Sequence, residues 1–306
     1  MTDHATIYEV GPRDGLQMAK ATMPTATKLR WIDAMAAAGV AHMEVGSFVS
    51  PRHVPQMADT ADVVGHTVAI AGLETIALVP NETGARLAYA AGCRSLVIPV
   101  SVSETHSRSN INKGTYEQVA EVARLVAWLR AQDEPVLVET ACATAFGCSF
   151  EGAVPERRVV EVATALLQAG ADRVSLADTV GYAAPNAIRS LVRATRAAAG
   201  GAFQKLHLHD TMGLGLANVL AGLDVDVRHF DASLAGLGGC PFAPGASGNI
   251  VTEDLVFLLE SMGLRTGIDL EALVATRAFL REGLAGEPLH GSVGRAGIPR
   301  TFRAAA

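Results

Sequence analysis

Short apolar runs alternate along the chain with longer segments whose apolar residues recur at helical spacing. The short runs are rich in Val, Ile and Leu and nearly continuous in apolar residues, as parallel strands buried on both faces must be. Eight strands are predicted, over residues 6–10, 42–45, 75–79, 95–99, 135–138, 173–177, 205–209 and 229–233. Amphipathic helices are predicted between them, over residues 25–38, 84–91, 116–131, 155–169, 185–199 and 213–222.

A glycine closes several of these helical segments just before the next predicted strand. Gly39, Gly92, Gly170 and Gly222 stand at these positions, where a residue in the left-handed conformation commonly ends a helix. Strand–helix units repeated in this way predict a (β/α)8 TIM barrel of the α/β class. A doubly wound open sheet is the alternative, but no Gly-x-Gly-x-x-Gly follows the first strand, which argues against its dinucleotide-binding form.

The length and the final segments predict one barrel domain over residues 1–306. The barrel is expected over about residues 5–262, with a closing helix over 253–262 and a short helical tail over about 263–306. Of the residues, 49% are hydrophobic and 18% are charged, which is an ordinary globular balance and leaves enough apolar side chains for one large core.

Charge and cysteine content exclude several classes of partner. The net charge is −6 and no long Lys/Arg cluster is present, so we expect no nucleic-acid binding. The sequence shows neither a signal-peptide pattern nor an apolar run long enough to cross a membrane, so we expect no membrane partner. The four cysteines form no Cys-x-x-Cys pair, which favours the reducing cytoplasm.

Polar side chains gather at or just beyond the carboxyl ends of the predicted strands. In a TIM barrel these ends meet at one rim, where the chemistry takes place. Some of these residues can instead cap helices, which is the alternative for Thr179 and Asp210. The residues at these positions are Glu9, Arg13, Asp14, Gln17, Glu44, Ser47, Ser101, Ser103, Glu104, His106, Glu139, Thr140, Thr144, Asp178, Thr179, Asp210 and Asn249.

His207 and His209 are the sharpest signal among them. Residues two apart in a strand point to the same face, so the two imidazoles lie side by side as ligands of one metal ion would. Asp14 offers a carboxylate and Asn249 an amide oxygen. This mixture of nitrogen and oxygen donors favours Mg²⁺ or Mn²⁺. Zinc held by two histidines and one aspartate is the alternative.

A glycine-rich segment surrounds one of the cysteines, in Gly236-Leu-Gly-Gly-Cys240. So many glycines predict a loop that can hinge. A phosphate-cradling loop is less favoured, because the Lys and Ser/Thr of a P-loop are missing. Cys240 therefore stands where a thiol can act as an acid, whereas Cys93, Cys142 and Cys148 are expected to pack in the core.

Several segments resemble the 3-hydroxy-3-methylglutaryl-CoA lyase family, in matching order and over nearly the whole chain. The resemblance implies a (β/α)8 barrel, a divalent metal, a coenzyme A thioester substrate, a role in leucine degradation and a homodimer. The segments that carry it are Glu9-Val-Gly-Pro-Arg-Asp-Gly-Leu-Gln17, Ser47-Phe-Val-Ser-Pro51 with Val54-Pro-Gln-Met57, His207-Leu-His-Asp-Thr211, Ala235-Gly-Leu-Gly-Gly-Cys-Pro-Phe242 and Gly245-Ala-Ser-Gly-Asn-Ile-Val-Thr-Glu-Asp254.

The resemblance also implies roles for individual residues. Arg13 would stabilise the enolate oxygen of the leaving acetyl-CoA, and Cys240 would sit on the loop that closes over the substrate. Asp14, His207, His209 and Asn249 would hold the metal. The remaining expected site residues are Glu44 among the catalytic groups and, in contact with the substrate, Gln17, Ser103, Asp178 and Thr179.

The implied reaction is a metal-dependent retro-Claisen cleavage to acetyl-CoA and a keto acid. Asp14 and His207 are both candidates for the initial base, and Cys240 and His207 for the group that reprotonates the enolate. Glu139, Ala141 and Thr144 depart from the family's usual Arg-x-Tyr-x-Ser-Cys pattern, so the substrate is 3-hydroxy-3-methylglutaryl-CoA or a close analogue such as citramalyl-CoA. A condensing synthase of the same superfamily and a non-catalytic binding protein are the alternatives.

Overall fold

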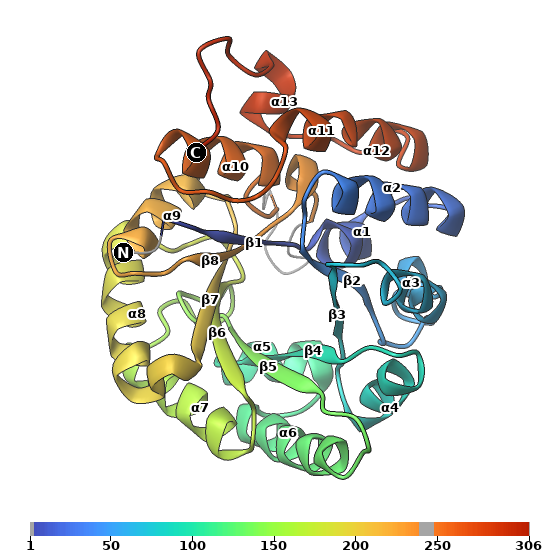
Figure 1. Ribbon diagram of the computed structural model, residues 1–306. Helices are drawn as coiled ribbons and strands as arrows, with labels where there is room; N and C mark the ends of the chain where they lie inside the picture. The colour runs from blue at the N-terminus through green and yellow to red at the C-terminus, as the bar shows by residue number, and fades with distance from the viewer. Residues whose placement is uncertain (1–2, 239–247, 306) are drawn as a thin grey trace.

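The computed structural model describes residues 3–238 and 248–305. Its strands are all parallel and close into one barrel in sequence order, with β1 pairing with both β2 and β8. A ring of helices surrounds them (Figure 1). This confirms the TIM barrel and excludes the open sheet. The strands are β1 (Thr6–Glu9), β2 (His42–Ser47), β3 (Glu74–Leu78), β4 (Ser95–Ser101), β5 (Leu137–Ala143), β6 (Arg173–Asp178), β7 (Phe203–Leu208) and β8 (His229–Ala232).

Each predicted helix is present, with ends shifted by a few residues at most. Residues 60–67, between β2 and β3, form a helix of the surrounding ring that the apolar pattern did not predict, and unpredicted short helices also lie in the connections after β1 and β4. The tail is helical, as expected. The helices are α1 (Leu16–Met18), α2 (Thr25–Ala37), α3 (Thr60–Thr67), α4 (Glu82–Ala90), α5 (Glu104–Ile111), α6 (Thr115–Arg130), α7 (Glu156–Gln168), α8 (Pro185–Ala199), α9 (Gly215–Leu223), α10 (Thr252–Ser261), α11 (Leu270–Ala275), α12 (Arg277–Gly283) and α13 (Ser292–Ala296). The tighter or wider turns are η1 (Gly11–Gly15), η2 (Pro55–Met57), η3 (Gly200–Ala202) and η4 (Leu234–Gly236).

The predicted helix-ending glycines are confirmed at three positions and wrong at the fourth. Gly39, Gly92 and Gly170 have φ values of 97°, 93° and 97°, in the left-handed region that ends a helix. Gly222 instead lies inside α9. A Cβ added there would lie 3.0 Å from a methyl carbon of Leu206 and close to Phe230, so this glycine lets α9 pack tightly on β7 and β8.

Strand β5 is longer than its apolar run predicts. It continues to Ala143 and pairs with β4 along its whole length. Glu139 and Thr140 were expected beyond this strand and lie within it. The apolar run ends before them because Glu139 faces the inside of the barrel, where it finds a buried cation, Lys205, 3.3 Å away.

Most of the core lies between the strands and the surrounding helices, and a second, smaller apolar cluster fills part of the barrel interior. Tyr8, Ile76, Leu78 and Val97 form this inner cluster. Charged side chains occupy much of the remaining interior, which is unusual for a fold whose barrel is generally filled by branched apolar residues. The barrel interior below the rim therefore contains buried charged side chains, and these lie next to the site described below.

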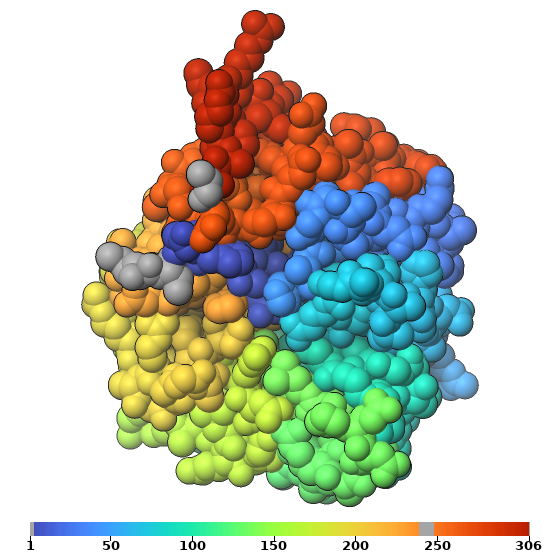
Figure 2. Space-filling view, in the orientation of Figure 1, coloured from blue at the N-terminus to red at the C-terminus, as the bar shows by residue number. Residues whose placement is uncertain are grey.

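The helical tail continues from α10 and packs beside α2 at the edge of the barrel (Figure 1). Arg277 on α12 forms a buried ion pair with Glu253 on α10, and donates a hydrogen bond to the carbonyl of His290. The amide of His290 in turn donates to the carbonyl of Ala235 at 2.8 Å. The tail thus holds η4. Part of the tail, drawn in dark red, projects from the body (Figure 2), but the last residues return to α10, where Phe302 stacks near Phe257 and the amide of Ala305 donates to Glu260 Oε2 at 2.7 Å. Within the described residues, no helix is both long and apolar enough to cross a membrane.

Candidate active site

The turn after β1 presents Arg13 and Asp14 at the barrel mouth. It forms a short π-helix, η1, in which the amides of Arg13 and Asp14 both donate to the carbonyl of Val10. Glycine is required at Gly15, because a Cβ there would lie 2.8 Å from the Cβ of Leu237. At Gly11 a Cβ would meet the buried carboxylate of Glu9. The Gly-Pro-Arg-Asp-Gly sequence therefore fits a turn pressed against η4.

Arg13 is fixed by two carboxylates from different elements. Its Nη2 donates to Glu44 Oε2 at 2.9 Å, and its Nη1 donates to Asp14 Oδ1 at 2.6 Å. Burial lowers the pKa of Arg13, but Glu44 and Asp14 raise it by more, so the guanidinium stays charged. Burial also opposes ionisation of Asp14, yet Arg13 and the two histidines hold the pKa of Asp14 well below its usual range.

The two histidines lie together as their spacing predicts. Nε2 of His207 is 3.1 Å from Nε2 of His209, and Asp14 Oδ2 is 3.8 Å from His209 Nε2. One ligand atom from each of these three residues lies within 4.8 Å of the other two. Asn249 joins the group, since its Nδ2 donates to Asp14 Oδ2 at 2.6 Å. All four residues predicted to hold a metal are therefore neighbours.

The donor atoms of this cluster fit a divalent cation. Two imidazole nitrogens face each other beside a carboxylate, an arrangement that leaves lone pairs crowded together. Asn249 Oδ1 and His209 Nδ1 are buried and have no hydrogen-bond partner within the described residues, although buried polar atoms are usually paired. Imidazole, carboxylate and amide oxygen are ligands that suit Mg²⁺ or Mn²⁺, and they also suit zinc.

The residues expected to contact the substrate are placed around the rim but serve local hydrogen bonds. Asp178 ends β6 and accepts from the amides of Tyr182 and Ala183 at 2.9 and 3.0 Å. Burial raises the pKa of Asp178 in spite of these bonds. Ser103 caps α5, and Thr179 Oγ1 accepts from the amide of Thr144.

Two further predicted positions have simpler surroundings. Gln17 lies in α1, and its buried Oε1 has no hydrogen-bond partner in the part of the chain that the structure describes. Asp210 Oδ1 accepts from the amide of Gly215, the first residue of α9, at 2.7 Å, although the N-cap residue of that helix is Leu214.

Two residues near the cluster were not among those predicted from the sequence. Asp231 on β8 places Oδ2 3.1 Å from His207 Nδ1, and Lys205 on β7 places Nζ 2.9 Å from Asp231 Oδ1. Both lie inside strands, whereas most of the predicted site residues stand at strand ends or beyond them. A signal was present, because a lysine two residues before His207 in a strand buried on both faces requires a buried partner for its charge.

Cys240 and its neighbouring residues 239–247 lie outside the described residues. Cys93, Cys142 and Cys148 are buried and reduced, as packing cysteines are expected to be. Burial raises the pKa of Cys93 to about 11 and that of Cys142 to about 12, so neither thiol ionises readily.

The family model described as HMGL-like matches residues 4–280 of the chain. The chain belongs to the HMGL-like family. It is 42% identical to the hydroxymethylglutaryl-CoA lyase of Pseudomonas mevalonii over 268 residues, which cover 87% of this chain and 88% of that protein. It is 41% identical to the (R)-citramalyl-CoA lyase of Chloroflexus aurantiacus over 302 residues, which cover 95% and 94%.

Solved structures of the family agree with this HMGL-like barrel closely. A hydroxymethylglutaryl-CoA lyase from Pseudomonas aeruginosa has a TM-score of 0.91 and 36% identity, covering 97% of this chain and 98% of that one. A lyase from Acinetobacter baumannii, solved in complex with coenzyme A and 3-methylmalate, also has a TM-score of 0.91, with 37% identity and coverage of 98% and 97%. The family expected from the motifs is therefore confirmed, and with it a carbon–carbon lyase.

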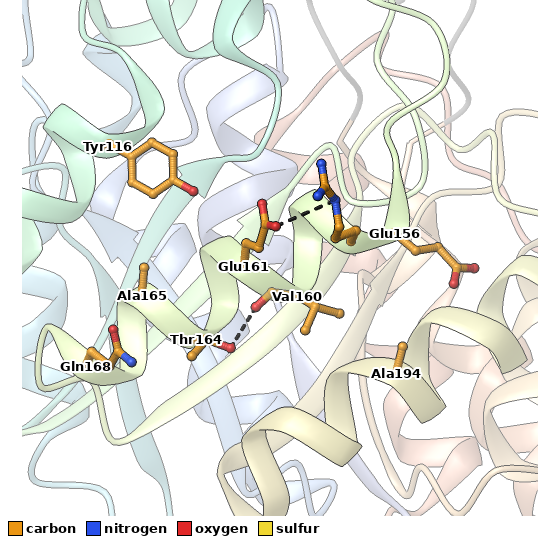
Figure 3. A pocket seen from close by; sticks show the side chains of 9 residues that line it. Tyr116, Glu156, Val160, Glu161, Thr164, Ala165, Gln168 and Ala194 are labelled. Carbon is orange, nitrogen blue, oxygen red and sulfur yellow. Dashed lines mark hydrogen bonds and ion pairs between the residues drawn. The ribbon is translucent and has the colours of Figure 1, made fainter.

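A separate hollow on the outside of the HMGL-like barrel lies away from this rim. Helix α7 lines most of it, with α6 and α8 beside it (Figure 3). Arg157 Nε lies 3.6 Å from Glu161 Oε1, and Thr164 Oγ1 donates to the carbonyl of Val160 at 2.8 Å. These polar groups thus satisfy one another, and we place the chemistry at the rim, where charged groups converge.

Proposed function

We propose that the chain cleaves a 3-hydroxyacyl-CoA thioester by a retro-Claisen reaction, giving acetyl-CoA and a keto acid. The observation that carries this proposal is the convergence of Arg13 with Asp14, His207 and His209 at one rim. An oxyanion and a hydroxyl would then be held by adjacent groups. The names of the relatives support a substrate that is 3-hydroxy-3-methylglutaryl-CoA or citramalyl-CoA.

A divalent cation, Mg²⁺ or Mn²⁺, would be held by Asp14, His207, His209 and Asn249. When bound, it would supply positive charge that makes the substrate hydroxyl easier to deprotonate. At the mouth, the two carboxylates of Asp14 and Glu44 lie beside the one guanidinium of Arg13. The second negative charge is available to a bound cation. The identity of the ion is part of this proposal.

In the reaction, the 3-hydroxyl loses its proton and becomes a carbonyl as the bond between C2 and C3 of the acyl chain breaks. The released electron pair moves to C2 and the thioester oxygen as an enolate. Arg13 remains charged and is held on one side by Glu44 and Asp14, so it can meet this oxygen without reorganisation. A proton then returns to C2, and Cys240 or His207 is proposed as its donor.

The choice between the two acyl groups is proposed to depend on β5. Ala141 packs beside the inner cluster of Tyr8, Ile76, Leu78 and Val97, and Glu139 carries a negative charge below it. The family's usual motif has a larger side chain and a positive charge at these positions.

We also propose that the protein is cytoplasmic and forms a homodimer.

The test is a cleavage assay with a panel of 3-hydroxyacyl-CoA thioesters in which free acetyl-CoA is followed. The panel contains 3-hydroxy-3-methylglutaryl-CoA and both enantiomers of citramalyl-CoA, and an Asp14→Ala variant serves as the inactive control. Release of acetyl-CoA from one member, absent in the variant, supports the proposal. If no member is cleaved while acetyl-CoA and a keto acid are condensed irreversibly, the chain is a synthase and the proposal is wrong.

A further inference from the structure

A lysine lies inside the barrel, one layer below the histidines. Lys205 is only 4% exposed. Its Nζ lies 2.9 Å from Asp231 Oδ1, 3.3 Å from Glu139 Oε1 and 4.3 Å from the centre of the Tyr8 ring. A buried ammonium group is tolerated only where charges of opposite sign compensate for its lost hydration. The two carboxylates and the aromatic face supply that compensation.

These contacts form a chain of interactions across the barrel interior. Ser175 Oγ donates to Glu139 Oε1 at 2.7 Å, which fixes the far end of the chain. Lys205 then joins Glu139 of β5 to Asp231 of β8. The second oxygen of Asp231 lies 3.1 Å from Nδ1 of His207. One carboxylate thus receives the ammonium on one oxygen and the imidazole on the other.

We propose that Lys205 is a positioning residue for the metal ligand His207, a role that rests on the proposed metal site. A carboxylate that accepts the Nδ1 proton of a histidine turns its Nε2 toward the ion. Lys205 holds that carboxylate, because its ammonium anchors Oδ1 of Asp231 while Oδ2 faces His207. Without the ammonium, Asp231 and Glu139 become two like charges with no cation between them, and Asp231 turns away from His207.

The test measures Mn²⁺ affinity of the metal-free protein by electron paramagnetic resonance, together with thermal unfolding. Lys205→Met keeps the length of the side chain and removes its charge. Glu139→Gln removes one of the two carboxylates, and the double variant removes both the cation and the repulsion. Lys28→Met is the matched control. Lys28 lies on α2, outside the barrel, is as deeply buried as Lys205, and pairs with Asp59 at 2.6 Å.

Lys205→Met is expected to bind Mn²⁺ about tenfold or more weakly, as losses of groups that orient metal ligands do. Lys28→Met is expected to lose thermal stability and keep its Mn²⁺ affinity. The double variant is expected to bind Mn²⁺ more tightly than Lys205→Met alone, because the repulsion on Asp231 is gone. A lysine that only fills space would give no such recovery.

Three results contradict the inference, and they can be told apart. If the wild-type protein binds no Mn²⁺, the proposed metal site is wrong and the positioning role with it. If the wild-type protein binds Mn²⁺ and Lys205→Met binds it equally well, only the positioning role is wrong. A double variant that binds no better than Lys205→Met likewise contradicts the like-charge argument, even where the single variant is weakened.

Discussion

Arg13 contacts Glu44 through one hydrogen bond and one further close ion-pair contact. Nη2 donates to Oε2 at 2.9 Å, and Nε lies 2.8 Å from Oε1. Together with the hydrogen bond from Nη1 to Asp14, these contacts fix the orientation of the cation at the mouth of the barrel. A lysine carries the same charge but has neither the fork nor the rigid plane.

We therefore expect Arg13→Lys to be a damaging substitution. A fixed donor at an oxyanion is typically worth about 3 kcal/mol, so turnover should fall by about a hundredfold. The measurement is the rate of acetyl-CoA release at saturating substrate. Arg30→Lys is the control, since Arg30 also pairs with a glutamate, Glu282, but lies on the exposed face of α2. An Arg13→Lys enzyme as fast as the wild type would reduce Arg13 to a structural ion-pair partner.

Removal of metal should abolish turnover if the cluster of Asp14, His207 and His209, whose ligand atoms lie close enough to share one ion, holds the proposed cation. Exhaustive chelation is expected to stop acetyl-CoA release, and added Mg²⁺ or Mn²⁺ should restore it. Elemental analysis before and after chelation checks that the ion has been removed. Full activity in a sample shown to contain no metal would contradict the proposed site.

The fold could be predicted from the sequence because each strand is buried on both faces and each is followed by a helical period. The His207–His209 pair was equally accessible, since two residues along a strand always share a face. Distances between Arg13, Glu44 and Asp14 were not accessible, because they depend on a π-helical turn that no apolar pattern encodes. The closeness of these groups required the motif or the structure.

Residues inside strands were harder to predict than residues at strand ends. Asp231 and Lys205 compensate each other's charge from different strands, so the sequence shows that Lys205 needs a partner but does not show which residue it is. Gly222 shows the same limit, because its role is to admit the side chains of Leu206 and Phe230, which arrive from two other elements. Pairings between distant segments are therefore what the sequence pattern leaves undetermined.

The role of Cys240 as a proton donor is predicted from the sequence motif and can be tested by substitution. If its thiol returns the proton to the enolate, Cys240→Ser and Cys240→Ala should lose most of their turnover. Both variants should keep normal thermal stability and metal content. Thiol-directed reagents should inactivate the wild-type enzyme, and a substrate analogue should protect it.

The control for the reagent is the Cys240→Ala variant, in which the remaining cysteines are buried. If both Cys240 variants turn over normally, or if activity falls only in step with unfolding, the cysteine is structural. His207 is then the remaining candidate for the proton donor.

Glu9, the last residue of β1, links this strand to η1, η4 and α10 through a buried carboxylate. Its Oε1 accepts from the amides of Gly11 and Leu234 at 2.8 and 2.9 Å, and its Oε2 accepts from Thr252 Oγ1 at 2.6 Å. Burial raises the pKa of Glu9 to about 7, although the three hydrogen bonds oppose this shift. No cation lies among its hydrogen-bond partners, so ionisation of this group weakens the folded state.

Glu9→Gln should therefore gain stability relative to the wild type as the pH rises. The folded pKa of about 7 lies above the unfolded value of 4.5, so the contribution of Glu9 is fully present below pH 4.5 and is lost as the pH rises through 7. Gln stays uncharged, and its amide can still accept from both backbone amides and donate to Thr252. Between pH 5 and pH 8, the difference in unfolding free energy should shift by about 2 kcal/mol in favour of Gln. Denaturant unfolding of both proteins at the two pH values measures this shift, in which every other titrating group cancels. A difference that does not change with pH would mean that Glu9 ionises as readily in the fold as in the unfolded chain.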